Sequence, residues 1–350
     1  MKDYHNHIIS VKLDARSALS CLTALPDIES RTLFVVDDND ELVGTITDGD
    51  IRRGLLDGLE ITHGIEFFMN KGFKYLYEAD DSLTKIKDYR SKGIDFVPVV
   101  TSTKKIIKIV DLKAVKALLP ATAFLMAGGR GERLRALTDN VPKPILLVGD
   151  KPIMQHNIDR LIRYGINEFY ISIKYLGNRI KDYFGDGHDK GVCIKYIEEE
   201  EPLGTIGALS LAEGVSNEHL LLMNSDLLTN IDYEDFFDFY LQSKADICIA
   251  SIPYTVNVPY AVLQTRTDRI ISFEEKPTYT YYSNGGVYFM RSSVKQRIPY
   301  KSFYNATDLM QEMIEAEEDV CHYPVLCYWL DIGRQQDYLK AQEDIKHIKL

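Results

Sequence analysis

The sequence has no long apolar run. Within its 350 residues, no stretch approaches the roughly 18 apolar residues that a membrane-spanning helix needs. The first ten residues, MKDYHNHIIS, lack the apolar core of a signal peptide. We therefore expect a cytoplasmic protein that does not act at a membrane.

Paired cysteines and net positive charge are also missing. The five cysteines, at 21, 193, 248, 321 and 327, do not have the spacing of zinc or redox sites, so we expect reduced thiols. The formal net charge of −11 argues against a nucleic-acid partner. Positive charge gathers in one place, because residues 130–151 hold five Lys or Arg against three Asp or Glu.

Residues 1–119 contain two similar halves. In 32–56, strand-like runs flank a turn and lead into a short helix, and the same pattern recurs in 95–119 after a helical stretch at 82–93. Each half is too short to bury much surface alone, so the two should dock face to face. We expect one module at residues 1–60 and a second at 61–119.

This first third resembles a tandem pair of CBS modules, most specifically in GTITDGDIRR. The resemblance implies that Thr47 and Asp50 hold the ribose of an adenine nucleotide effector, and a carboxylate is a suitable acceptor for ribose hydroxyls. The second half lacks the threonine before Asp111, so at most one intact site is expected. The alternative is a packing and dimerisation module that binds nothing. Because CBS pairs often self-associate, we expect a homo-oligomer.

From residue 120 onward, strands and helices alternate. Pro120 ends the preceding helix. The patterns predict strands at 121–128, 167–174, 219–226, 246–253 and 285–290, and helices at 151–165, 176–185, 233–243 and 335–345. This order predicts an α/β domain over 120–350 with a Rossmann-like, mostly parallel sheet covered on both faces. Ligands of such sheets bind at the carboxyl ends of the strands.

A glycine-rich loop follows the first of these strands, in LMAGGRGERLRALTDNVPKP. Gly128, Gly129 and Gly131 allow several backbone N–H groups to converge on one anion. The loop lacks the Gly-Lys-Ser/Thr ending of a Walker A motif and the third glycine of a dinucleotide loop. Arg133, and Lys143 between two prolines, add positive charge. These residues favour a phosphate-binding loop over a plain turn.

Two aspartates follow apolar strands. Asp226 ends LLLMNSD, and Asp331 stands in WLDIG before the last helix. An aspartate has little reason to lie there for packing, whereas Mg²⁺ prefers carboxylate and phosphate oxygens. The two can share an ion only if their strands are neighbours. The alternative for Asp226 is a helix N-cap.

The last two thirds of the chain resemble sugar-1-phosphate nucleotidyltransferases. The likeness is carried by MAGGRGERLRALTDNVPKPILLVGDKPI and by the later PLGTIGA, FEEKP, SNGG and WLDIG stretches. The departures from the family pattern near SNGG leave the sugar open. The resemblance implies nucleotide contacts from Ala127, Gly128, Gly129, Gly131, Gly204 and Thr205, catalytic cations at Arg133, Lys143 and Lys276, sugar contacts from Glu275, Asn284 and Gly285, and Mg²⁺ on Asp226 and Asp331.

The activity implied by this resemblance is transfer of a nucleoside monophosphate from a nucleoside triphosphate to a sugar 1-phosphate, with release of pyrophosphate. A CBS pair ahead of such a domain is most similar to the glucosamine-1-phosphate guanylyltransferases of bacterial legionaminic acid synthesis, which implies GTP and a role in surface glycans. Mannose-1-phosphate or heptose-1-phosphate guanylyltransfer is the alternative within the class. A non-catalytic nucleotide sensor is the alternative outside it.

Two further clusters have an ordinary structural interpretation. We interpret residues 198–200, three glutamates, as a solvated acidic run. Tyrosines at 279, 281, 282 and 288 offer a possible lining for a sugar pocket, but we expect them to pack in the core.

Overall fold

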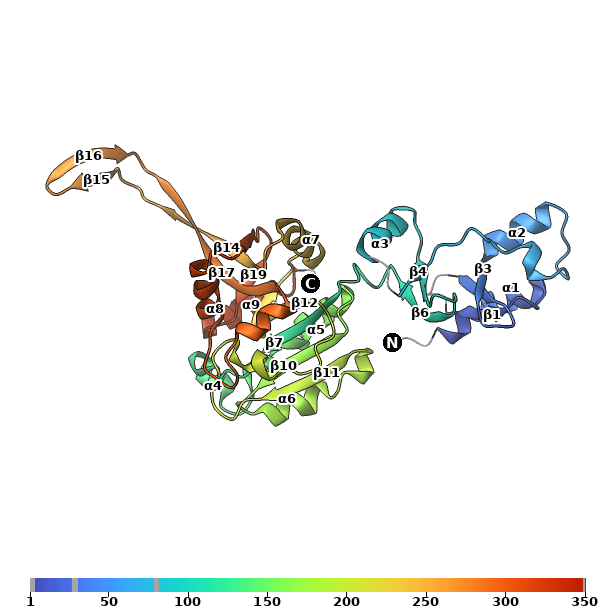
Figure 1. Cartoon of the computed structure of the whole chain (residues 1–350), viewed down its shortest axis with the longest axis horizontal. Coiled ribbons are helices and arrows are strands. Elements are labelled where there is room, and N and C mark those ends of the chain that lie inside the picture. Colours follow the sequence, from blue (N-terminus) through green and yellow to red (C-terminus); the bar gives the residue numbers. More distant parts are fainter. Residues whose placement is uncertain (1–3, 27–30, 79–81, 349) are drawn as a thin grey trace. The chain divides into compact units, whose positions relative to one another are not determined.

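The computed structural model describes residues 4–26, 31–78, 82–348 and 350, and the chain forms two compact units, residues 1–119 and 120–350 (Figure 1). Within the described residues, no helix has both the length and the apolar character needed to cross a bilayer. The cysteines are all free thiols.

The first unit contains two three-stranded sheets of the same topology. In each sheet the first two strands are parallel and the third is antiparallel to the second. The first sheet is β1 (Ile8–Ser10), β2 (Thr32–Val36) and β3 (Leu42–Thr47), and the second is β4 (Leu76–Tyr77), β5 (Phe96–Val100) and β6 (Ile106–Asp111). The helices are α1 (Ala15–Ala24), α2 (Asp48–Leu56) and α3 (Ser82–Ser91), with 3-10 turns at His5–His7 and Ile65–Phe67. The strands of this repeat match the two similar halves of the sequence. The expected helix after the third strand forms only in the first half, as α2, because residues 112–120 are turn and coil, and no helix directly precedes Pro120.

The two halves of the first unit share one apolar core. Its buried members come from both sheets: Phe34, Leu42, Phe96, Val100 and Ile109. The Leu42 N–H also donates to the Lys104 carbonyl at 2.9 Å. The predicted face-to-face docking is confirmed.

Packing of the first half extends past residue 60. Ile65 and Phe68 are buried in the core of the first sheet, and the Ile65 N–H donates to the Leu13 carbonyl at 2.9 Å. Residues 61–69 therefore belong structurally with the first half.

The second unit is built around a seven-stranded sheet in the order β11-β10-β7-β12-β17-β14-β18. The first four strands in this order run parallel, β17 is antiparallel to both neighbours, and β18 is parallel to β14. Their bounds are β7 (Ala121–Met126), β10 (Glu168–Ile173), β11 (Cys193–Glu198), β12 (His219–Asn224), β14 (Ile247–Asn257), β17 (Thr278–Arg291) and β18 (Val320–Pro324). The predicted α/β fold with a sheet rich in parallel pairs is confirmed, with β17 as the antiparallel exception.

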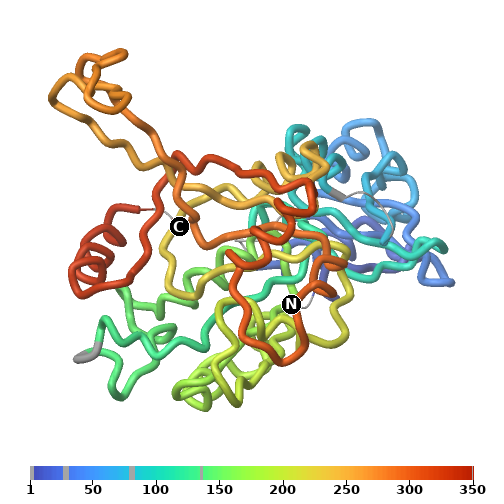
Figure 2. Tube along the Cα trace, turned by 60° about the vertical axis from the view of Figure 1, so that its left-hand side comes forward, coloured from blue at the N-terminus to red at the C-terminus, as the bar shows by residue number. Residues whose placement is uncertain are grey.

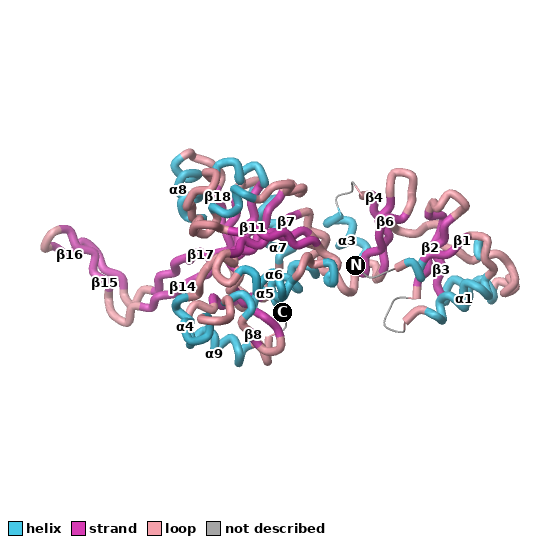
Figure 3. Tube along the Cα trace, turned by 90° about the horizontal axis from the view of Figure 1, so that it is seen from below, coloured by secondary structure: helices cyan, strands magenta, loops and turns pink. Residues whose placement is uncertain are grey.

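Helices cover the sheet above and below (Figure 3). The helices of this unit are α4 (Arg135–Thr138), α5 (Ile153–Arg163), α6 (Gly177–Phe184), α7 (Tyr233–Ser243), α8 (Ala306–Glu315) and α9 (Gln335–Asp344), with 3-10 turns at Glu132–Leu134, Lys143–Ile145, His188–Lys190, Gly207–Leu211 and Ser292–Arg297. The strands β7, β10 and β12 are almost wholly buried, as expected for strands covered on both faces. The predicted helix at 233–243 coincides with α7, which begins after Asp232 because that side chain accepts from two backbone N–H groups.

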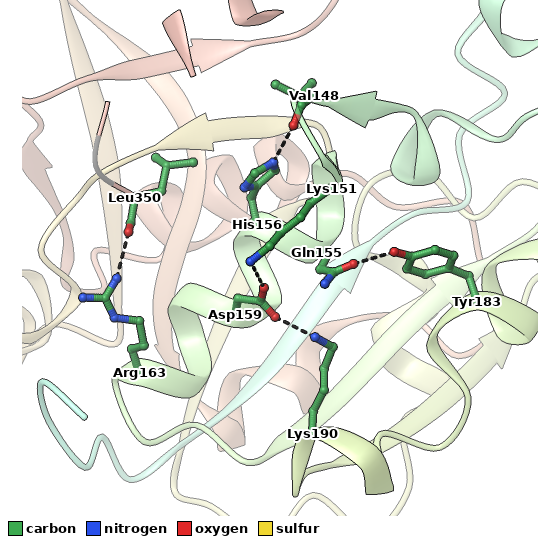
Figure 4. Close-up of polar contacts among 9 residues, drawn as sticks. All are labelled: Val148, Lys151, Gln155, His156, Asp159, Arg163, Tyr183, Lys190 and Leu350. Carbon is green, nitrogen blue, oxygen red and sulfur yellow. Dashed lines mark hydrogen bonds and ion pairs between the residues drawn. The ribbon is translucent and has the colours of Figure 1, made fainter. Parts of the chain in front are cut away.

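Polar contacts hold α5 in place (Figure 4). Asp159 accepts from Lys151 at 2.9 Å and from Lys190 at 2.8 Å. The Asn157 side chain donates to the Leu227 carbonyl at 2.9 Å. Leu227 begins β13 (Leu227–Thr229), which pairs with β19 (Trp329–Asp331). The helix therefore fixes the two-stranded sheet that carries the predicted metal ligands. A second pair is β8 (Leu147–Val148) with β9 (Lys151–Pro152).

Strands β14 and β17 continue beyond the sheet as a two-stranded ribbon, extended by the hairpin of β15 (Val262–Arg266) and β16 (Arg269–Glu274) (Figures 1 and 2). We call residues 252–282 the arm. Apart from Pro277, its side chains are half-buried or exposed. The expectation that Tyr279, Tyr281 and Tyr282 pack in the core is wrong, because all three lie on this uncovered ribbon, whereas Tyr288 is buried.

Candidate active site

The glycine loop starts where β7 ends, at the carboxyl edge of the parallel strands. Ala127 is buried, and its N–H donates to the Ser172 carbonyl on β10 at 3.1 Å, so this amide is already used by the sheet. Gly131 has φ +67°, in the left-handed region that favours glycine. The Ala127 amide is therefore not free to bind an anion. The backbone amides that follow it in the loop are the candidates for anion binding.

Two glycines of the loop face different surroundings. A side chain at Gly128 would have its Cβ 2.5 Å from Oε1 of Glu199, so only glycine leaves room for this carboxylate. At Gly129 the equivalent position is open. The Arg130 guanidinium lies over the Tyr175 ring, 5.4 Å from its centroid, and this cation–π contact fixes its position beside the glycine loop.

Lys143 and Asp226 form an ion pair beside the loop. Lys143 is only 8% exposed, between the buried Pro142 and Pro144, and its ammonium donates to Oδ2 of Asp226. An ammonium is buried to this extent only next to a compensating charge. Both residues line a cavity of about 340 Å³ together with the glycine loop.

Asp331 lies on the strand next to Asp226. Leu227 and Asp331 are Cα partners in the antiparallel pair of β13 and β19. The Ile332 N–H donates to the Asp226 carbonyl at 3.1 Å. Asp226 lies in the turn directly before β13, so the two aspartates are next to each other at the start of this strand pair.

Basic side chains oppose the charge of this aspartate pair. Burial and the nearby Asp226 raise the pKa of Asp331, and Lys143 and Arg133 act in the opposite direction. The Arg133 guanidinium lies so close to the backbone after β19 that a Cβ at Gly333 would be 3.2 Å from its Nη1. The sequence-predicted Arg133, Lys143, Asp226 and Asp331 are thus brought together.

The aspartate pair fits a hard divalent cation. Oδ1 of Asp226 and Oδ1 of Asp331 are both buried, and neither has a hydrogen-bond partner among the described residues. Over the same described ranges, no group of three or more His, Cys, Asp or Glu is placed to hold a metal ion. Mg²⁺ is commonly held by one or two carboxylates, with phosphates and water as its remaining ligands. These residues therefore suit Mg²⁺ that binds together with a phosphate.

A larger cavity, of about 690 Å³, adjoins the first. The two share the lining residues Met126, Gly129, Glu132 and Asp226. The larger cavity is also lined by Glu199, Gly204, Thr205 and Asn224. Its volume lies within the range of small-molecule sites. The arrangement offers space for a nucleoside whose phosphates extend toward the aspartates.

Glu199 is a site residue that the sequence interpretation missed. It is 9% exposed, whereas Glu198 and Glu200 are exposed, so the interpretation of this run as solvated is wrong at its middle residue. Burial raises the pKa of Glu199, although its Oε2 accepts the Leu203 N–H at 3.1 Å. The available signal was weak: Ile197, two residues earlier, is buried and a strand that continued past β11 would place Glu199 on the same face, but Ile194 on the opposite face is buried as well.

Gly204 and Thr205 form the loop that closes this cavity. Gly204 has φ +76°, and its Cβ would lie 2.6 Å from the Tyr304 carbonyl. The Thr205 hydroxyl accepts the Ala306 N–H at 2.8 Å at the start of α8. The loop is therefore tied to α8, and the Thr205 hydroxyl already has a structural partner.

Asn284 and Gly285 lie on β17 at an irregularity in its pairing with β14. Oδ1 of Asn284 accepts the Gly286 N–H at 2.9 Å, and the Gly285 carbonyl accepts from Trp329 Nε1 at 2.9 Å. A Cβ at Gly286 would be 2.5 Å from Nδ2 of Asn224, which lines the larger cavity. These residues therefore lie beside the cavity.

Glu275 and Lys276 are not brought to the glycine loop. Both are exposed on the arm, just after β16, and neither lines the two cavities described above. Figure 1 shows the arm leading away from the sheet. The sugar-phosphate role that the family resemblance implies for Lys276 stays a prediction, since Lys276 lines neither cavity of its own chain.

Thr47 and Asp50 of the first unit form a capping box at the start of α2. Asp50 Oδ2 accepts from the Thr47 hydroxyl at 2.6 Å and from its N–H at 2.8 Å. Asp50 Oδ1 accepts from Arg53 at 2.6 Å. Both side chains thus hold the helix start, and a ribose would compete with these contacts.

Family comparisons match both units of the chain. The sequence pattern of the nucleotidyl transferase family matches residues 122–348, and that of the CBS domain matches residues 5–57. The family match therefore covers all the residues that form the two cavities.

Individual relatives align with the second unit. D-glycero-alpha-D-manno-heptose 1-phosphate guanylyltransferase of Aneurinibacillus thermoaerophilus is 31% identical over 230 residues, which are 64% of this chain and 98% of that protein. Mannose-1-phosphate guanylyltransferase of Mycobacterium tuberculosis is 29% identical over 229 residues, 64% of either chain. A candidate glucose-1-phosphate thymidylyltransferase of Bacillus anthracis, solved with sucrose, superposes with a TM-score of 0.54 at 22% identity and covers 66% of this chain and 97% of its own, which shows a shared fold.

Proposed function

The chain belongs to the nucleotidyl transferase family, and we propose that it transfers a nucleoside monophosphate from a nucleoside triphosphate to a sugar 1-phosphate. The observation that carries the proposal is the meeting of Lys143, Asp226, Asp331 and the glycine loop around one cavity. A buried lysine and two aspartates, beside a loop of glycine amides, suit a reaction between phosphates.

In the proposed reaction, a phosphate oxygen of the sugar 1-phosphate attacks the α-phosphorus of the triphosphate. The new P–O bond forms as the bond from the α-phosphorus to the bridging oxygen breaks, and pyrophosphate leaves. The sugar phosphate is already ionised near neutral pH, so no general base is required. Arg133 and the loop amides stabilise the leaving pyrophosphate, and Lys143 neutralises charge at the α-phosphate.

Asp226 and Asp331 are the proposed ligands of Mg²⁺, which when bound neutralises phosphate charge and orients the phosphates for in-line displacement. Lys143 adds a second positive charge beside Asp226. The two orphaned carboxylate oxygens support this assignment.

Guanine is the proposed base, and Glu199 supports it. Guanine presents two adjacent donors, N1–H and the 2-amino group, and a carboxylate accepts both with its two oxygens. Glu199 is buried in the wall of the larger cavity, where its Oε2 already accepts the Leu203 N–H and further donors from a base would stabilise its charge. The two relatives described above, both guanylyltransferases by name, also favour GTP.

Glucosamine 1-phosphate is the proposed sugar, on the resemblance of a CBS pair joined to this transferase. A cytoplasmic location and a role in bacterial surface-glycan synthesis belong to the same proposal. Heptose 1-phosphate and mannose 1-phosphate are the alternatives, because the relatives are named for those substrates.

The test is pyrophosphate release with Mg²⁺, from four nucleoside triphosphates combined with glucosamine, N-acetylglucosamine, mannose, glucose and heptose 1-phosphates. We expect release with GTP and glucosamine 1-phosphate, and its loss in Asp226→Asn with the protein still folded. Release with another pair would keep the reaction and change the substrate. Silence across the whole panel would contradict the reaction and favour a nucleotide sensor.

A regulatory role for the first unit is part of the proposal, supported by the CBS match over residues 5–57. Adenine nucleotide bound beside Thr47 and Asp50 would replace contacts of the capping box. We expect ATP or AMP to raise the melting temperature and to alter turnover. If neither nucleotide changes either quantity, the first unit serves packing alone.

A further inference from the structure

The arm exposes apolar surface along its whole length. Outside Pro277, none of its apolar side chains is buried. Eight large ones are between 52% and 76% exposed: Tyr254, Tyr260, Leu263, Ile270, Ile271, Phe273, Tyr281 and Tyr282. Exposed apolar side chains gathered on one segment in this number are typical of an interaction site.

The hairpin at the tip has no third strand and no helix to cover it. Strands β15 and β16 pair only with each other among the described elements. A two-stranded ribbon is marginally stable in water by itself, and its outer edges present unpaired N–H and C=O groups. A partner that covers the apolar side chains of the arm would therefore stabilise it.

The charge of the arm identifies the class of partner. Its 31 residues carry three basic side chains and three acidic ones, whereas the whole chain has a net charge of −11. A nucleic acid or an anionic lipid surface requires an excess of basic residues. A neutral surface rich in tyrosine, isoleucine and phenylalanine is typical of the core of a protein–protein interface.

The position of Glu275 and Lys276 identifies the partner itself. These residues, to which the family resemblance gives contacts with the sugar and its phosphate, are carried on the arm and line neither cavity of their own chain. A second copy of the chain presents the same cavity and the same arm. If each arm docks on the other copy, both arms are covered. Each cavity then receives Glu275 and Lys276 from the partner chain.

We propose that two copies of the chain exchange their arms, so that the partner's Lys276 and the partner's Glu275 complete the sugar side of each cavity. This inference rests on the proposed function for its catalytic part. Such an exchange is isologous and closes as a dimer. The arm offers about the number of residues, roughly 20–30 per side, that a stable interface uses.

The test is complementation between two inactive full-length variants. Lys276→Met removes the arm cation, and Asp226→Asn removes a ligand of the cavity. In a mixed dimer with exchanged arms, the chain with an intact Asp226 receives an intact Lys276 from its partner. Co-expression in equal amounts should then restore about a quarter of the intact turnover, since half of the dimers are mixed and each has one complete site.

The matched control combines Asp226→Asn with Asp331→Asn. Both lesions lie in the cavity and not on the arm, so no mixed dimer contains a complete site and activity stays absent. Recovery in the first mixture but not in the second supports arm exchange. Activity in the first mixture no higher than in the control shows that Lys276 acts within its own chain, which overturns the proposal.

A second measurement is independent of turnover. A photo-crosslinking amino acid replaces the exposed Phe273 in the full chain, and the products are sized and mapped after irradiation. We expect a covalent dimer in which residue 273 is joined to residues 120–350 of the partner. Crosslinks only within one chain would overturn arm exchange even if the enzyme is active. A crosslinked dimer with no turnover for any substrate would instead contradict the proposed function and leave the docking intact.

Discussion

At the residue scale, the candidate site is organised by compensation of buried charge. Lys143 is nearly enclosed and is paired with Asp226, while Asp331 is left with an orphaned oxygen and a raised pKa. Such an arrangement is unfavourable for an empty pocket and favourable once a cation and phosphates enter. The sequence motifs identify these three residues, but only the fold shows that Lys143 and Asp226, 83 positions apart, are in contact.

Replacement of Glu199 by glutamine tests base recognition. The variant keeps the shape of the side chain but loses one acceptor for guanine, so kcat/KM with GTP should fall roughly 10- to 100-fold. Inosine triphosphate lacks the 2-amino group, so the variant's kcat/KM with this nucleotide should fall much less. Steady-state kinetics with both nucleotides measures the difference.

The matched control for this prediction is Glu200→Gln, because Glu200 is the exposed neighbour. It should leave both rates unchanged. An equal loss for GTP and inosine triphosphate in Glu199→Gln would show that Glu199 supports the loop and does not read the base.

At the element scale, periodicity predicted the strands and helices that carry the site, because β7, β12 and α7 have clear apolar patterns and defined ends. The exposure of the arm was not predicted, and the reason is physical. Its tyrosines and isoleucines have the apolar, β-prone character of a packed strand, and the sequence does not say whether the residues that cover them come from the same chain. The burial of Glu199 was not predicted, because it stands directly after β11 in a run of acidic residues that is typical of exposed surface.

The ion pairs of Asp159 give a test of how α5 is anchored. Burial alone would raise the pKa of Asp159, but hydrogen bonds from Lys190 and Lys151 outweigh it, and the pKa lies below the ordinary value. A lowered folded pKa stabilises the protein above the unfolded value near ~3.9, and this contribution is lost as pH falls through the folded pKa.

Asp159→Asn should therefore lower the free energy of unfolding by about 1 kcal/mol at pH 7, and the deficit should shrink below about pH 4. Urea denaturation across this range measures it, with the exposed Asp182→Asn as the control. A deficit that is constant with pH would contradict the role of the ion pairs.

At the scale of the whole molecule, a chain of net charge −11 has to bring two polyanions together. It does so by concentrating basic residues in 130–151, around the glycine loop of the second unit. The repeat in the first unit is visible in the sequence, because both halves have the same order of apolar runs. In the structure, the two sheets accordingly begin with the same parallel strand pair. Assembly through the arm depends on a second chain, and one sequence does not contain that information.

The most direct test of the central claim follows the α-phosphate of GTP. Radiolabelled [α-³²P]GTP is incubated with the intact chain, Mg²⁺ and each sugar 1-phosphate, and the products are separated. We predict that the label passes into a nucleotide sugar in the intact protein and remains in GTP in Asp226→Asn. A folded, GTP-binding protein that forms no labelled nucleotide sugar with any sugar 1-phosphate would contradict the account.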